Sequence, residues 1–239
     1  MIVIPTFNEA ANIADCLAAL RTACDAGTAP DVLVVDDNSP DDTGGVVRRL
    51  ARGKWRDRLF LMVRDRKRGL GTAYIEGFKW GLEQGYTVLV EMDGDLSHHP
   101  RHLAAMMDQL RRYDFVVGSR YVCGGGVRGW GWGRLAISRL GSLYARIVLG
   151  LPIRDLTGGF NAWNRAVLEK INLNAVVSEG YAFQIELKYR AAMQGFRWRE
   201  WPIVFEDRRR GRSKMSRRIV LEAVYRVWQL KWRSGRMKG

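Results

Sequence analysis

The stretch that decides the fold is TVLVEMDGDLSHHP, which covers residues 87–100. Its first part, 87–92, is a mostly apolar run, as is typical of a strand that is covered by helices on both faces of a parallel sheet. The run ends in two carboxylates one residue apart, Asp93 and Asp95. Pro100 then stands at a favourable first position for a helix over 100–112.

The same unit of strand and helix recurs along the first half of the chain. Further apolar, β-branched runs predict strands at 2–5, 32–35, 59–63 and 115–118. Helical patterns between the runs predict helices at 9–25, 43–52 and 72–84. Repeated strand–helix units predict an α/β fold, a doubly wound, mostly parallel, Rossmann-like sheet flanked by helices.

The pattern changes after residue 120. The glycine-rich stretch 123–134 contains two tryptophans and predicts a mobile, functional loop. Beyond it, the sequence predicts a basic amphipathic helix at 134–149, followed by a turn, a short strand and the start of a helix at 156–168. It then predicts a helix at 181–194 and a strand at 196–207. The last predicted elements are a basic loop and a helix at about 216–233. We therefore expect a catalytic domain over 1–215 and a C-terminal basic amphipathic helix within 216–239.

The composition, 239 residues with 47% hydrophobic side chains, is sufficient for a substantial core. The formal charge of +14 is uneven, because residues 1–100 carry 12 basic and 15 acidic side chains whereas residues 197–239 carry 14 and 4. Such a basic C-terminal part attracts nucleic acid, a phosphate-bearing substrate or an anionic membrane surface. Three scattered cysteines favour a reducing compartment. Neither a signal peptide nor an apolar window long enough to span a bilayer is visible.

Polar clusters follow three of the predicted strands. The clusters are Pro5, Thr6, Asn8 and Glu9, then Asp36, Asp37, Asn38 and Ser39, and then Asp93 and Asp95. Ligands of open α/β sheets bind beyond the carboxyl ends of the strands, where acidic groups can accept hydrogen bonds from a ribose and a base. A D-x-D pair can hold Mg²⁺ or Mn²⁺ with phosphate oxygens completing the shell. The absence of G-x-G-x-x-G argues against an NAD enzyme.

Each cluster also has a structural interpretation. Residues 36–42, DDNSPDD, are turn formers and could be only a turn and helix cap, and an isolated D-x-D is often a solvated turn. Because both lie at strand ends in one α/β pattern, we favour the site. His98 and His99 are candidate metal ligands, but adjacent histidines point in different directions, so we favour a cap or a phosphate contact for them.

Taken together, nine motifs resemble those of the dolichyl-phosphate (polyprenyl-phosphate) mannosyltransferases, GT-A fold glycosyltransferases of family 2. They are IPTFNE (4–9), VVDDNSPDDT (34–43), GLGTAY (69–74), MDGDLSHHP (92–100), GSRY (118–121), GVRGWGWGRLAISRLG (126–141), DLTGGF (155–160), GYAFQIE (180–186) and DRRRGRSK (207–214). The order is that of the family, and the resemblance covers nearly the whole chain. It looks like the form of the enzyme without transmembrane hairpins.

The resemblance implies inverting transfer of mannose from GDP-mannose to a polyprenyl monophosphate, with Mg²⁺ or Mn²⁺ as cofactor. The residues implied to bind the donor are Pro5, Phe7, Glu9, Asp36, Asp37, Asp93, Gly94, Arg208 and Lys214. Those implied for the acceptor phosphate are Arg120, Arg134, Ser138 and Arg208, and those for the metal are Asp93, Asp95 and Ser97. Of these, Asp95, Arg120 and Arg134 would be catalytic. Phe7, Ser97 and Glu179 stand where relatives often carry Tyr, Gln and Lys.

The residues themselves fit a phosphate acceptor. A sugar hydroxyl needs a general base to remove its proton, and we find no Ser–His–Asp pattern. A phosphate monoester is already anionic near neutral pH, since its second pKa is about 6, and can attack directly. The enzyme then needs placement and cations on both anions.

A lipid acceptor requires a bilayer surface, and two predicted helices suit one. The helix at 134–149 carries Arg139, Ser142 and Arg146 on one side, and the final helix combines a polar stripe with apolar residues and tryptophans. Alternatively, these faces pack on the domain or on a membrane-anchoring partner protein. We expect a cytoplasmic protein, peripheral on the cytoplasmic face of a membrane.

Three other functions remain open at this point. The same fold could use UDP-glucose or another nucleotide sugar. The charge and the stretch DRRRGRSKMSRR (207–218) also suit a nucleic-acid-binding protein, but no recognised binding module is present and the acidic strand ends would repel phosphate, so we predict no nucleic-acid partner. A non-catalytic membrane scaffold would leave Asp93 and Asp95 unexplained.

Overall fold

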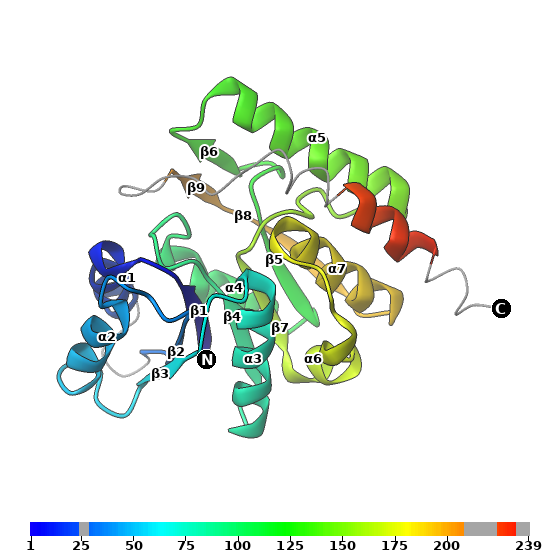
Figure 1. Cartoon of the computed structure of the whole chain (residues 1–239). Helices are drawn as coiled ribbons and strands as arrows, with labels where there is room; N and C mark the ends of the chain where they lie inside the picture. The colour runs from blue at the N-terminus through cyan, green and yellow to red at the C-terminus, as the bar shows by residue number, and fades with distance from the viewer. Residues whose placement is uncertain (24–28, 208–223, 233–239) are drawn as a thin grey trace.

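The computed structural model describes residues 1–23, 29–207 and 224–232 (Figure 1). Its strands are β1 (Ile2–Thr6), β2 (Val32–Asp36), β3 (Leu59–Val63), β4 (Val88–Glu91), β5 (Phe115–Ser119), β6 (Gly126–Arg128), β7 (Asn161–Asn164), β8 (Trp198–Pro202) and β9 (Val204–Glu206). Its helices are α1 (Ala10–Ala23), α2 (Thr43–Ala51), α3 (Leu70–Glu83), α4 (Leu103–Gln109), α5 (Trp132–Leu149), α6 (Arg165–Lys170) and α7 (Gly180–Met193), with short 3₁₀ turns at Pro100–His102 and Leu173–Ala175.

Seven strands form one sheet in the order β3-β2-β1-β4-β7-β5-β8. Every neighbouring pair is parallel except the two that involve β7, which is antiparallel to β4 and to β5. The predicted, mostly parallel α/β sheet is therefore confirmed. The reversal of β7 has a simple cause: the chain leaves α5, reaches the carboxyl edge of the sheet through residues 150–160, and enters β7 from that edge.

Helices cover both faces of the sheet (Figure 1). Alternate residues of each strand point to opposite faces, so in β1 the side chains of Ile2 and Ile4 pack into one core cluster and Val3 into the other. Helices α1, α2 and α4 contribute to the first cluster, and α3, α6, α7 and the inner side of α5 contribute to the second. This two-sided burial explains the apolar runs in the sequence, because every side chain of such a strand meets a helix.

Two features of the second half differ from the expectation. The stretch predicted as one strand, 196–207, forms β8 and β9 in different sheets, with the buried Ile203 between them. The glycine-rich stretch 123–134, predicted as a loop, contains the short strand β6, which pairs in parallel with β9. Both differences arise because β6 and β9 find each other only through long-range pairing, which no local pattern reveals.

The C-terminal helix is described over residues 224–232, and the remainder of the prediction for 216–233 lies outside the described residues. Val227 and Leu230 of this helix are buried in the same core cluster as α5 and α7. Tyr144 of α5 donates a hydrogen bond to the carbonyl of Val224 at 3.2 Å, so the two helices lie side by side (Figure 1). None of the helices that the structure describes is long and apolar enough to cross a bilayer.

Candidate active site

The carboxyl ends of β1, β2 and β3 lie level with one another. Thr6 at the end of β1 pairs with Asp36 at the end of β2, and Asp36 pairs with Val63 at the end of β3. On the other side of β1, the N–H of Met92 donates to the carbonyl of Val3 at 3.3 Å. The turns that follow β1, β2 and β4 therefore meet at one edge of the sheet, as the sequence predicted for the three polar clusters.

The first two clusters are joined through Asp36. Its buried carboxylate accepts hydrogen bonds from the hydroxyl of Thr6 at 2.8 Å and from the N–H and hydroxyl of Ser39 at 2.9 and 2.6 Å. The Ser39 hydroxyl in turn accepts from the N–H of Asn8 at 3.0 Å. Glu9 accepts a hydrogen bond from Asn12 at 2.8 Å. Asp36 thus holds the turn after β1 against the turn after β2 and shapes the predicted nucleotide site.

Asp37, which was predicted to contact guanosine, is paired with a protein side chain in the structure. Its carboxylate is bound by the buried guanidinium of Arg64, which follows β3, and accepts from the N–H of Arg68 at 3.2 Å. Arg64 also donates to the carbonyl of Gly69 at 2.9 Å and to the hydroxyl of Thr72 at 2.7 Å. Asp37 therefore fixes the loop from β3 to α3, and its contact with guanosine stays a prediction.

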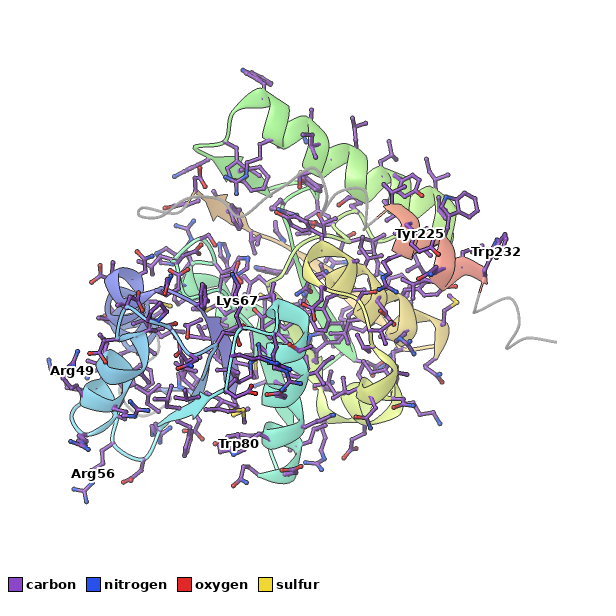
Figure 2. The ribbon with its side chains drawn as sticks, viewed as in Figure 1. Arg49, Arg56, Lys67, Trp80, Tyr225 and Trp232 are labelled. Atoms are coloured by element: carbon purple, nitrogen blue, oxygen red, sulfur yellow. The ribbon has the colours of Figure 1, made fainter. Side chains whose placement is uncertain are left out.

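A cation that the sequence reasoning did not single out lies beside Phe7. The ammonium group of Lys67 is 4.1 Å from the centroid of the Phe7 ring, and Figure 2 shows Lys67 above the central strands. Such a cation–π contact contributes about 0.5–1 kcal/mol at an exposed site. It brings a positive charge to the predicted donor site, where a diphosphate would be bound.

The turn after β4 presents two carboxylates with different environments. Asp95 is buried and accepts from the N–H of Ser97 at 3.0 Å, whereas the side chain of Asp93 is 34% exposed. The hydroxyl of Ser97 is buried and forms no hydrogen bond within the described part of the chain. Leu96, which lies between Asp95 and Ser97, has a positive φ of 66°, an uncommon conformation that turns the chain sharply. The turn therefore gathers three oxygen groups, and one of them, the hydroxyl of Ser97, has no partner in the part of the chain that the structure describes.

These oxygens fit a hard divalent cation. Mg²⁺ is commonly held by one or two carboxylates together with substrate phosphates and water. The described residues contain no group of three or more His, Cys, Asp or Glu side chains that could hold an ion by themselves. Asp93, Asp95 and Ser97 would supply the protein's share of such a shell, and the diphosphate would supply the rest.

The two histidines act as structural contacts. Nδ1 of His98 accepts from the N–H of Asp93 at 3.1 Å, and its ring stacks on Phe160 with centroids 5.0 Å apart. Burial lowers the pKa of His98 to about 4, so the imidazole is neutral at physiological pH. Nδ1 of His99 accepts from the N–H of Arg101 at 3.2 Å and caps the following 3₁₀ turn, as the sequence analysis favoured.

Arg120, which follows β5, forms a buried ion pair that the sequence reasoning missed. Its Nε and Nη2 donate to the two carboxylate oxygens of Asp155, each at 2.7 Å, and Nη2 also donates to Thr157 at 3.0 Å. The structure shows Asp155 as a partner of Arg120, because a guanidinium buried to this extent requires a buried counter-charge. The phosphate contact that the resemblance implied for Arg120 stays a prediction.

The other predicted acceptor residues lie beside this pair. The Arg134 guanidinium donates to Asp207 at 2.8 Å and stacks on Trp130 at 4.1 Å, while its Nε finds no acceptor among the described residues. The hydroxyl of Ser138 accepts from Tyr121 at 2.7 Å. The guanidinium of Arg120 lies 5.5 Å from the Trp130 ring and 5.1 Å from the Tyr121 ring. The structure thus brings Arg120, Arg134 and Ser138 together, whereas Arg208 and Lys214 lie outside the described residues.

Two fully buried charges lie below the site. Burial raises the pKa of Glu91 on β4 to about 7 and lowers the pKa of Lys188 on α7 to about 8, and the attraction between the two opposes both shifts. The sequence carried one signal of them: Glu91 interrupts an apolar strand that should be covered on both faces, and a charge there requires a partner. Glu179, noted as a departure from relatives, accepts from the N–H of Gly71 at 3.0 Å and so caps α3.

Comparisons with known proteins bear on this geometry. The family model of glycosyl transferase family 2 matches residues 1–172. The chain is 46% identical over 242 residues to the polyprenol monophosphomannose synthase of Mycolicibacterium smegmatis, and the alignment covers 100% of this chain and 90% of that protein. It is 47% identical over 225 residues to the undecaprenyl-phosphate mannosyltransferase of Micrococcus luteus, with 94% and 90% covered.

Solved structures resemble the fold. Glucosyl-3-phosphoglycerate synthase from Mycobacterium tuberculosis in complex with phosphoglyceric acid matches with a TM-score of 0.65 and 20% identity, over 95% of this chain and 79% of that chain. The same enzyme in complex with Mn²⁺, UDP and glucosyl-3-phosphoglycerate matches with a TM-score of 0.64 and 21% identity, over 95% and 78%. At such identities the likeness concerns the fold, a mostly parallel sheet flanked by helices.

Proposed function

We propose that this chain, which belongs to glycosyl transferase family 2 and is a glycosyltransferase, transfers mannose from GDP-mannose to the phosphate of a polyprenyl monophosphate. The observation that carries the proposal is the arrangement of charge at the sheet edge. An acidic turn with Asp93 and Asp95 suits a metal-bound diphosphate, and the arginine cluster with Arg120 and Arg134 suits a second anion. The two curated relatives are named for this mannosyl transfer to a lipid phosphate.

The reaction follows from the charges of the two substrates. An oxygen of the acceptor phosphate forms a bond to the anomeric carbon of mannose while the bond from that carbon to the diphosphate breaks, so GDP leaves and the configuration inverts. No proton has to be removed from the acceptor, whose second pKa is about 6. This agrees with the structural role of His98, which accepts a hydrogen bond from the N–H of Asp93 and stacks on Phe160.

The protein contributes placement and electrostatic stabilisation. A bound Mg²⁺ or Mn²⁺ would neutralise charge that develops on the leaving diphosphate. Asp93, Asp95 and the hydroxyl of Ser97 would hold it, in accord with the buried Ser97 oxygen, which has no hydrogen-bond partner among the described residues. On the acceptor side, Arg134 has a buried N–H without an acceptor among the described residues, which an incoming phosphate oxygen would satisfy.

The proposal is tested by incubating the protein with radiolabelled GDP-mannose, Mn²⁺ and a short polyprenyl phosphate. We expect labelled lipid and its loss on addition of a chelator. Isothermal titration with GDP-mannose and with UDP-glucose compares the donors directly. Tighter binding of UDP-glucose, together with transfer of glucose, would replace the proposal by the alternative donor.

We further propose that the acceptor is reached from a membrane surface, with the protein peripheral on the cytoplasmic face. The outward face of α5 bears exposed apolar side chains, namely Trp132, Ile137, Leu140, Leu143 and Ile147. The adjoining helix at 224–232 exposes Tyr225, Trp228 and Trp232, and Figure 2 shows Tyr225 and Trp232 on this helix. Exposed apolar side chains gathered on one face suit an interaction surface. Arg139 in α5 and Lys231 in the last helix are basic, which suits an anionic bilayer. A membrane-anchoring partner protein is the alternative occupant.

Replacing both Trp228 and Trp232 with serine should weaken binding to anionic lipid vesicles by at least roughly tenfold. The side chains are 51% and 76% exposed, so the fold should tolerate the change. Burying about 100 Å² of each indole would contribute about 2.5 kcal/mol. Vesicle sedimentation measures the effect, with Met107→Ser in α4, another exposed apolar residue, as the matched control. Unchanged binding by the double variant would contradict the membrane surface.

A further inference from the structure

Glu91 and Lys188 are two buried charges that the proposed reaction does not use. Both side chains have a relative exposure of 0%. Burying a charge is costly unless it is paired and hydrogen-bonded, and a pair of apolar side chains is often as stable or more stable. A packed core alone therefore gives no reason for these two residues, and their hydrogen bonds point to another role.

The hydrogen bonds of Glu91 lead away from the metal turn toward the neighbouring strand and helix. Its carboxylate accepts from the indole N–H of Trp163 on β7 at 2.7 Å and from the side-chain amide of Gln184 on α7. The carbonyl oxygen of Gln184 accepts from Asn161 at the start of β7 at 2.9 Å. Asn161 also donates to the backbone carbonyl of Gly158 at 3.2 Å. The chain of hydrogen bonds thus connects β4 with the segment 155–160.

Lys188 holds the same segment from the other side. Its ammonium group donates to the backbone carbonyls of Leu156 at 3.1 Å and Gly158 at 2.6 Å. Asp155 and Thr157 in that segment bind Arg120, and Thr157 shares a hydrogen bond of 3.1 Å with Ser142 of α5. The connection therefore runs from β4, the strand that precedes Asp93 and Asp95, to the arginine cluster, and on to the helix that carries Arg134.

A second contact ties the two sides together. Phe160 at the end of the same segment stacks on His98, which accepts a hydrogen bond from the N–H of Asp93. The segment 155–160 therefore contacts the D-x-D turn on one side and the arginine cluster on the other. Any change in its position would alter the distance between the two predicted anion sites, which the reaction requires to be set within a fraction of an ångström.

We propose that Glu91, Gln184, Asn161 and Lys188 form a positioning network that sets the segment 155–160, and through it Arg120, relative to the D-x-D turn. These four residues touch neither substrate. They act on the transfer step by placing the acceptor phosphate opposite the anomeric carbon. This inference rests on the proposed function and adds residues to it that the sequence motifs do not assign.

The test compares steady-state kinetics of the wild-type protein with Lys188→Met, Glu91→Gln and the double variant. Because the double variant removes both buried charges, we expect a melting temperature close to or above that of the wild type. We expect kcat/KM for the polyprenyl phosphate to fall about 10- to 100-fold, with KM for GDP-mannose within about twofold. Leu59→Ala is the control, because Leu59 is buried at the start of the edge strand β3, away from the carboxyl ends of the strands. It should lower the melting temperature without changing either KM.

The outcomes separate the two proposals. Transfer by the wild type together with wild-type kinetics of the double variant would overturn the network alone. The network is also overturned if the loss affects donor and acceptor equally or follows only the folded fraction. Failure of the wild type to transfer mannose would overturn the proposed function, and the network with it. Should the double variant not fold, Asn161→Ala interrupts the hydrogen bonds without leaving a charge and is measured in the same way.

Discussion

Replacing Asp95 with alanine should lower mannosyl transfer by about a thousandfold or more while the protein stays folded. Metal neutralisation of a leaving group supplies several kcal/mol to the transition state, and each 1.36 kcal/mol is a factor of ten in rate. Asp95 is the more buried carboxylate of the D-x-D turn and accepts a backbone hydrogen bond from Ser97. Losing that hydrogen bond would reduce the free energy of unfolding by about 1 kcal/mol.

Labelled transfer from GDP-mannose at saturating Mn²⁺ measures the effect, and titration calorimetry compares Mn²⁺–GDP binding by the variant and the wild type. Asp108→Ala is the matched control, since Asp108 is an exposed carboxylate on α4, remote from the strand ends. It should leave both the rate and the nucleotide affinity unchanged. Substantial transfer by the Asp95 variant would remove the metal from the mechanism and with it the reason for the acidic turn.

Replacing Asp155 with alanine should reduce the free energy of unfolding by about 3–5 kcal/mol, because it leaves the buried guanidinium of Arg120 without its counter-charge. For a chain of this length that corresponds to a fall in melting temperature of roughly 10 °C. Denaturation in urea and thermal unfolding measure the loss. Arg120→Met combined with Asp155→Leu should recover most of the stability, since two apolar side chains need no partner, while transfer stays low because the arginine cluster has lost a member.

The same ion pair has a defined pH dependence. Burial tends to raise the pKa of Asp155, but the charge of Arg120 and its hydrogen bonds hold the pKa below the usual value. A carboxyl with a lowered pKa in the folded state contributes stability above its unfolded pKa of about 3.9, and that contribution is lost as the pH falls further. The stability difference between wild type and Asp155→Ala should therefore be full at pH 7 and shrink below about pH 4. A constant difference would show that Asp155 acts through packing instead.

Local patterns carried most of the secondary structure. The strands at 2–6, 32–36, 59–63, 88–91 and 115–119 differ from the predicted ranges by at most one residue at either end, because each is a mostly apolar run and all but β3 are buried along most of their length. The helices from α1 to α5 and α7 were likewise predicted within a few residues. The strand β6 and the division between β8 and β9 were missed, since both depend on pairing between residues 126–128 and 204–206.

The candidate site divides in the same way. Asp36, Asp93 and Asp95 could be placed at strand ends from the sequence, because a strand and the turn after it are adjacent in the chain. The partners of the buried charges could not be placed, since Arg120 meets Asp155 across 35 residues and Asp37 meets Arg64 across 27. The hydrophobic periodicity of the sequence predicts which side chains are buried, but it does not predict which of the buried side chains contact one another.

The order of strands, helices and acidic turns was thus determined by the sequence itself, through the short-range requirement that apolar faces be covered and turns be polar. Which charges neutralise one another was decided by the tertiary structure alone. The antiparallel strand β7 brings residues 155–160 to the carboxyl edge between β4 and β5. A buried charge is stable only beside its partner, and that partner is chosen by the arrangement of the strands in space.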